Sequence, residues 1–188
     1  NLIKKHKIMK NTSKTKKSNV TPVTLINSKS IKNILTEKKR IETTLLNDWK
    51  RLYNNNQILN SQKRDFDIDA LYSMIIKGEE ALYNLKLAQI AANVGLTKIS
   101  ELPEKSNYRN IYKLSNLELR KQNLEKILKE RSRNEEIKNA KHPIVFKSHF
   151  DEIKLLELIS TTQAEIDIIK TNIEAFNDNS FTLNDLPF

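Results

Sequence analysis

The sequence predicts an all-α fold: an elongated antiparallel bundle of coiled-coil-like hairpins with a disordered basic N-terminal arm. Apolar residues recur at three- and four-residue steps in four segments, which is the spacing of one helix face. Aromatic residues make up only 6% of the 188 residues, and such narrow apolar stripes suit helix seams. Two glycines are too few for the tight turns of an ordinary all-β domain.

The first helix is expected over residues 30–53. Ser28 and Ser30 are candidate N-caps, because a serine hydroxyl can accept a free backbone N–H of the first turn. The asparagine run 54–56 favours a stop, since asparagine prefers caps and turns to helix interiors. The single apolar stripe of this segment consists of Ile31, Ile34, Leu35, Ile41, Leu45, Trp49 and Leu52.

The second helix is expected over residues 67–94 and pairs with the first in a hairpin covering about 30–94. Its apolar positions alternate steps of three and four, as in a heptad seam. Gly95 follows directly and is suited to the residue just past a helix end. The seam consists of Ile68, Leu71, Ile75, Gly78, Leu82, Leu85, Gln89 and Ala92.

A long connection is expected over residues 96–114, followed by a third helix. The sequence 115–118 reads Ser-Asn-Leu-Glu, a capping box, with Leu114 and Leu119 placed as its hydrophobic staple. The half of this helix from Lys129 to Lys141 is nearly all charged. We expect that half to project into solvent, fray or meet a partner.

The fourth helix is expected after a short extended stretch over 143–146, with Ser148 as its N-cap and Asp151 as the carboxylate of the cap. It forms a second hairpin with the third helix, over about 115–177. The predicted division is therefore an arm (1–28), a bundle (29–179) and a tail (180–188). The stripe of the fourth helix consists of Ile153, Leu156, Ile159, Ile166, Ile169, Ile173 and Phe176.

The excess positive charge lies in the first quarter of the chain. The chain carries a formal net charge of +10, while residues 51–188 hold equal numbers of acidic and basic side chains. An acid-free block of lysines repels itself and lacks apolar periodicity, so we expect the arm to be disordered in isolation. The seven lysines before residue 20 are Lys4, Lys5, Lys7, Lys10, Lys14, Lys16 and Lys17.

Two interpretations of this arm stay open. It neutralises phosphates, on nucleic acid or on an anionic membrane face, or it is a solubilising tail in a lysine-rich composition. Because no aromatic residue precedes Trp49, the arm has no platform on which bases could stack. If it binds nucleic acid, we expect it to contact the backbone without reading sequence.

No group of residues predicts catalysis or a cofactor. The chain has no cysteine, which excludes disulfides and thiolate metal sites. An EF-hand loop starting at Asp65 would need glycine and glutamate where Ala70 and Ile76 stand. We therefore interpret the acidic cluster 65–69 as helix capping, with a looser magnesium site as the alternative.

Other polar clusters also have simple explanations. Ser148, His149 and Asp151 are the residue types of a hydrolase triad, but neighbours at a helix start do not converge on one point. The acidic pairs 79–80 and 135–136 are interpreted as solvated helix faces. We expect no enzyme, no cofactor and no metal.

The order of elements resembles the septicolysin-like family of small bacterial helical proteins. The residues that carry the resemblance are Ile90-Ala91-Ala92-Asn93, at the end of the central helix, and Phe146-Lys147-Ser148, before the last one. The resemblance implies a small helical protein, and no residue role is transferred from it.

Taken together, these features predict a non-enzymatic scaffolding subunit of a virion or ribonucleoprotein type of assembly. The alternative is a nucleic-acid-binding protein that uses the basic arm. Protein partners or self-association are expected through the helices, and no apolar run is long enough to span a membrane. The absence of a signal core favours an intracellular or virion-associated location over secretion. The predicted partner-helix contacts are Ile68, Leu71, Ile75, Leu82, Leu85, Ile166, Ile169 and Ile173.

Overall fold

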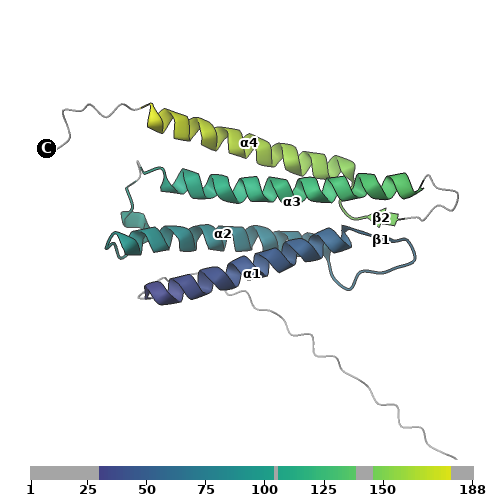
Figure 1. Cartoon of the computed structure of the whole chain (residues 1–188), viewed down its shortest axis with the longest axis horizontal. Coiled ribbons are helices and arrows are strands. Elements are labelled where there is room, and N and C mark those ends of the chain that lie inside the picture. Colours follow the sequence, from purple (N-terminus) through teal and green to yellow (C-terminus); the bar gives the residue numbers. More distant parts are fainter. Residues whose placement is uncertain (1–29, 104–105, 139–145, 179–188) are drawn as a thin grey trace, which may run out of the picture.

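The structure is a computed structural model that describes residues 30–103, 106–138 and 146–178, with only the backbone for 131–138. The predicted arm and tail lie outside the described residues. Four long helices lie side by side in an elongated bundle (Figure 1), which confirms the all-α prediction. The elements are α1 (Ile31–Asn56), β1 (Gln57–Leu59), α2 (Ile68–Asn93), the 3-10 helix η1 (Ile99–Glu101), α3 (Tyr108–Lys138), β2 (Phe146–Ser148) and α4 (Glu152–Asn177).

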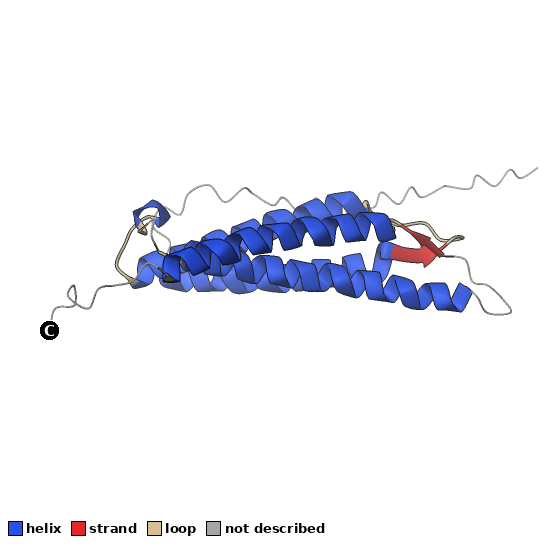
Figure 2. Ribbon diagram, turned by 90° about the horizontal axis from the view of Figure 1, so that it is seen from above, coloured by secondary structure: helices blue, strands red, loops and turns tan. Residues whose placement is uncertain are grey.

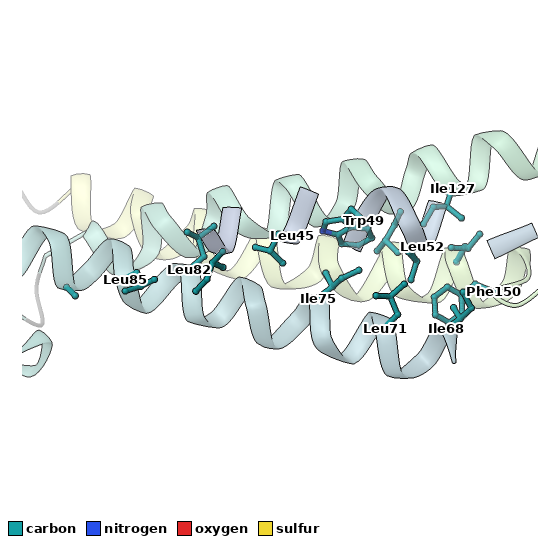
Figure 3. Packing of buried hydrophobic residues seen from close by; sticks show 14 of the residues in the cluster. Leu45, Trp49, Leu52, Ile68, Leu71, Ile75, Leu82, Leu85, Ile127 and Phe150 are labelled. Atoms are coloured by element: carbon teal, nitrogen blue, oxygen red, sulfur yellow. The ribbon is translucent and has the colours of Figure 1, made fainter. Parts of the chain in front are cut away.

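The bundle is built from two antiparallel hairpins, α1 with α2 and α3 with α4 (Figures 1 and 2). The main apolar core runs along α1 and α2 (Figure 3), and buried residues of α3 and α4 join it toward the end that carries the strands. In it, Trp49 meets Tyr72 edge-on with 6.1 Å between ring centroids, and Tyr72 meets Phe150 at 5.6 Å. Toward the other end the apolar side chains divide into two smaller clusters.

The two smaller clusters belong to different hairpins. One gathers Leu87, Ala91 and Leu102 around the end of α2 and η1, and the other gathers Leu117, Ile166 and Ile169 between α3 and α4. The hairpins therefore share their large apolar core near one end. Toward the other end they meet through Tyr112 of α3, which packs on the first small cluster, and through polar side chains of α2 and α3.

The termini of the first hairpin follow local capping rules. Ser30 caps α1, and Asp67 caps α2 by accepting the N–H groups of Asp69 and Ala70. Gly95, at φ 79°, takes the left-handed conformation that ends α2. Its N–H donates to the Ala92 carbonyl and the next N–H donates to the Ala91 carbonyl, the hydrogen bonds of a Schellman motif. These capping predictions are confirmed.

The prediction that the third helix begins at Ser115 is wrong, because α3 begins two turns earlier, at Tyr108. The expected connection is correspondingly shorter and contains η1. Tyr112 packs on the cluster at the end of α2, and Leu114 packs on the cluster between α3 and α4. Burial of these side chains favours a helix through the segment, so the capping box at 115–118 lies inside α3 with Ser115 exposed.

The start of the fourth helix also differs from the prediction. Ser148 belongs to β2, and Asp151 caps α4 by accepting the N–H of Lys154. The extended segment pairs antiparallel with β1, a strand that the sequence did not predict, in the register Gln57↔Ser148, Ile58↔Lys147 and Leu59↔Phe146. Pro143 lies outside the described residues. One two-stranded sheet thus accompanies the helices in the described part of the chain.

In its first two turns, α4 buries a different face from the one that the predicted apolar stripe indicates. Leu155 is buried, whereas Ile153 and Leu156 are exposed. The reason is that Leu155 shares one face with Thr162, Ile166 and Ile169, all buried against the rest of the bundle. Because Ile153, Leu155 and Leu156 are all apolar, the sequence alone could not indicate which of them faces the bundle.

Asn56 joins the two hairpins beside the strands. Its side chain is 2% exposed, and its amide bonds both backbone groups of Phe150: Oδ1 accepts the N–H at 2.8 Å and Nδ2 donates to the carbonyl at 3.2 Å. The Asn56 carbonyl accepts from the His149 N–H at 2.9 Å and from Arg64 at 2.6 Å. We call Asn56, Arg64 and the residues they bond the clamp.

Asn56→Ala should destabilise the fold by about 2–3 kcal/mol, because it leaves the buried N–H and carbonyl of Phe150 without partners. Asn54→Ala is the matched control, since Asn54 is exposed near the same helix end and its replacement should cost well under 1 kcal/mol. Urea unfolding followed by circular dichroism measures both. Equal losses for the two variants would contradict the role of the clamp.

Candidate functional site

A cleft of about 480 Å³ opens where the hairpins meet through polar residues. Its walls come from α2, α3 and α4, and they combine carboxylates, cations and amides with apolar and aromatic side chains. The lining residues are Ile76, Glu79, Glu80, Tyr83, Asn84, Lys113, Asn116, Leu117, Arg120 and Glu165.

A buried ion pair forms the floor of this cleft. The Glu79 carboxylate on α2 accepts Arg120 Nε at 2.8 Å and Arg120 Nη2 at 2.7 Å, and the two side chains are 7% and 16% exposed. The Trp49 indole of α1 also acts on this carboxylate and lowers its pKa. The Glu79 side chain therefore joins α2 of one hairpin to α3 of the other.

Amide and ammonium groups extend this arrangement along α2. Asn116 Nδ2 donates to the Glu79 carbonyl at 3.0 Å, and Lys86 Nζ donates to Asn116 Oδ1 at 3.2 Å. Lys86 also lies 5.7 Å from the ring centroid of Tyr112. We call Glu79, Lys86, Asn116 and Arg120 the polar layer.

Burial dominates the electrostatics of the polar layer. It raises the pKa of the Glu79 carboxyl, although Arg120 and the Trp49 hydrogen bond act in the opposite direction. Burial likewise lowers the pKa of Lys86, which the nearby Glu42 partly offsets. It raises the pKa of Tyr72, where Arg120 has the opposite influence. In each case the low-polarity surroundings disfavour the charged form.

The chemistry available in the cleft is limited by these pairings. A carboxyl with a raised pKa in a cleft is a recognised kind of catalytic candidate. The Glu79 carboxylate, however, is already paired with the Arg120 guanidinium. Among the described residues lining the cleft there is no histidine, serine or threonine. Within the described part of the chain, no three His, Cys, Asp or Glu side chains form a group able to hold a metal ion.

Glu79 corrects a sequence prediction. The sequence predicts that both residues of the acidic pair 79–80 lie on a solvent-exposed helix face, but Glu79 is buried and only Glu80 is exposed. The available signal was spacing: Glu79 follows Ile75 by four residues and precedes Leu82 by three, which places it on the apolar face. The other acidic pair, 135–136, lies where only the backbone is described.

The residues predicted to contact a partner helix pack against other helices of this same chain. Ile166 and Ile169 are buried in the cluster with Leu117, and Ile173 packs beside them. The helices that the predicted residues contact belong to the same chain, so their burial requires no second copy. Those on α2 are buried in the main core and are visible in Figure 3: Ile68, Leu71, Ile75, Leu82 and Leu85.

Other residues singled out from the sequence are placed as follows. Asp67 is a cap, as predicted, while Asp69 Oδ2 lies 2.8 Å from His149 Nε2. His149 thus precedes α4 and contacts α2, instead of standing in the first turn of α4. Ser148 Oγ accepts from Gln57 Nε2 at 2.9 Å, so the three residue types of a triad do not converge. The seven lysines of the arm lie outside the described residues.

No family model, curated protein or solved structure matches this chain. The resemblance to the septicolysin-like family therefore receives no support from these comparisons. None of the helices in the described part of the chain combines the length and apolar character needed to cross a bilayer.

Glu79→Gln should leave stability at pH 7 unchanged or raised, because it removes the cost of burying a charge and keeps an acceptor for Arg120. A raised folded-state pKa means that folding favours the protonated form. The cost is absent below the ordinary pKa of glutamate and complete above the raised value. The wild type should therefore lose stability relative to this variant as pH rises through that window, measured by urea unfolding at several pH values.

The partner variant Arg120→Met should destabilise the protein by about 3 kcal/mol at neutral pH, because it leaves a buried carboxylate without its cation. The loss should shrink in acid, where Glu79 becomes protonated. A loss of the same size at every pH, in the same unfolding series, would show that the ion pair does not control this region.

Proposed function

We propose that the protein is a non-enzymatic structural subunit that acts through contacts between its helices and other chains. The supporting observation is the outward face of α4, where Ile153 is 79% exposed and Ile168 is 63% exposed. The small residues Ser160 and Ala164 stand exposed between them at helical spacing. A neighbouring helix could approach closely there.

The energy available from this face is appreciable. Burying one isoleucine side chain contributes about 1.5–3 kcal/mol, so two such anchors can stabilise an assembly that already has other contacts. Leu46 on α1 is also 70% exposed. A virion or ribonucleoprotein type of assembly is the proposed context, because this chain joins a helical bundle to a basic N-terminal segment.

Ile153→Lys with Ile168→Lys should weaken association without unfolding the bundle, since both side chains already contact solvent. We expect the wild type to self-associate with increasing concentration in sedimentation velocity, and the variant to stay monomeric. Ser73→Lys with Gln122→Lys is the matched control, because it adds the same charge at exposed positions of α2 and α3. A wild type that stays monomeric, or a control as impaired as the variant, would contradict association through this face.

A second candidate function is sequence-nonspecific binding of nucleic acid by the basic arm. It is supported by the charge distribution: residues 1–29 contain lysines but no aspartate or glutamate. Such a segment gains affinity by releasing the counterions of the phosphate backbone. The absence of aromatic residues before Trp49 argues against base stacking.

Removal of the residues before Ser18 should weaken binding to mixed-sequence duplexes and reduce its salt dependence. Each phosphate that the arm neutralises contributes about 0.9 to the slope of log affinity against log salt. Binding of the full chain and of the shortened chain is measured over a salt series. Equal affinities, or a flat response of the full chain, would identify the arm as a solubilising tail.

A further inference from the structure

A row of unpaired lysines runs along α1. Lys32, Lys39 and Lys50 are spaced by seven and eleven residues, about two and three helical turns, so they lie within about 20° of one line. The row spans about 27 Å at 1.5 Å per residue. All three side chains are exposed, and none forms an ion pair with a described residue.

The three acidic residues of α1 differ in their relation to the row. Glu37 is held by Arg40 through hydrogen bonds of 2.8 and 2.6 Å. Asp48 is partly covered, and burial raises its pKa while Arg51 has the opposite influence. Glu42 is exposed three residues after Lys39, so three lysines with one glutamate beside them leave the row with a net positive charge.

Three lysines on the other hairpin differ from the row because each is paired with a glutamate. Lys121 pairs with Glu125 at 3.4 Å on α3, and Lys154 pairs with Glu157 at 2.9 Å on α4. Lys170 of α4 reaches Glu118 of α3 at 3.5 Å. In each of these three pairs a glutamate lies beside the lysine, so the three lysines can be compared with the unpaired lysines of α1.

We propose that Lys32, Lys39 and Lys50 form a polyanion-binding row on α1 that contacts the phosphate backbone of nucleic acid. This inference rests on the second proposed function. The row begins three residues after Lys29, the last lysine of the acid-free segment. Its length matches several successive phosphates of a strand, and its charges carry no means of reading bases.

The side chains around the row favour nucleic acid over a membrane surface. Thr36, Thr43 and Asn47 adjoin the lysines and are exposed and polar. One side only is bordered by exposed apolar and aromatic side chains, and the exposed Glu42 interrupts them: Ile31, Leu35, Leu46 and Tyr53. A helix that lies in a bilayer interface needs a continuous apolar face, which this arrangement lacks.

The test uses the full chain with Lys32→Gln, Lys39→Gln and Lys50→Gln together. Glutamine has nearly the helix propensity of lysine, so the fold should be kept, as checked by circular dichroism. The matched control replaces Lys121, Lys154 and Lys170 with glutamine, which changes the net charge equally. A third variant replaces the seven arm lysines with glutamine.

Binding to a mixed-sequence duplex is measured over a salt series, and binding to anionic vesicles in parallel. The α1 variant should lower affinity and reduce the salt slope by about 2–3, since three phosphate contacts each contribute about 0.9. The control variant should reduce the salt slope by less than about 1, because the lysines that it replaces are already paired with glutamates.

Three results would overturn the proposal. If the α1 variant matches the control while the arm variant loses binding, the arm acts alone and the second proposed function stands. If the wild type does not bind nucleic acid, both proposals fail together. If the α1 variant affects only vesicle binding, the lysine row contacts lipid headgroups instead.

Discussion

The two hairpins of this protein depend on one another through a buried asparagine. Asn56 ends α1, and its side-chain amide pairs with the backbone of Phe150 just before α4. Arg64 adds donors to the carbonyls of Asn55 and Asn56 and a longer one, at 3.4 Å, to that of Lys147. The clamp therefore satisfies the polar groups that a helix end and a short strand expose, at the place where all four helices share an apolar core.

The opposite part of the bundle is held together by a different kind of contact. There the apolar side chains form two separate clusters, and the polar layer and Tyr112 cross between the hairpins. A buried ion pair adds little net stability, because desolvation offsets much of its attraction. Its geometry is nevertheless demanding, since Glu79 must meet Arg120 through its carboxylate and Asn116 through its carbonyl. We infer that apolar burial provides most of the stability, while the polar layer favours one alignment of the hairpins.

The two proposed contact surfaces lie on different hairpins. The unpaired lysine row lies on α1, the helix that follows the acid-free segment, whereas Lys121, Lys154 and Lys170 of α3 and α4 have acidic neighbours. The two most exposed isoleucines, Ile153 and Ile168, lie on α4, in the other hairpin. Contacts with a polyanion and contacts with another chain would thus use different hairpins, and the two proposed functions are compatible in one molecule.

The sequence by itself determined the features that depend on neighbouring residues. The class of fold, the caps Ser30 and Asp67 and the left-handed Gly95 follow from helical periodicity and from hydrogen bonds within a few residues. The apolar faces of α1 and α2 follow in large part, although Ile31 and Leu35 of the predicted α1 stripe are exposed. Only the tertiary structure decided where long-range burial competes with these rules. Tyr112 and Leu114 pack on separate clusters, so α3 begins before its capping box. Glu79 and Asn56 are buried because their partners come from segments distant in sequence, and no local pattern specifies those partners.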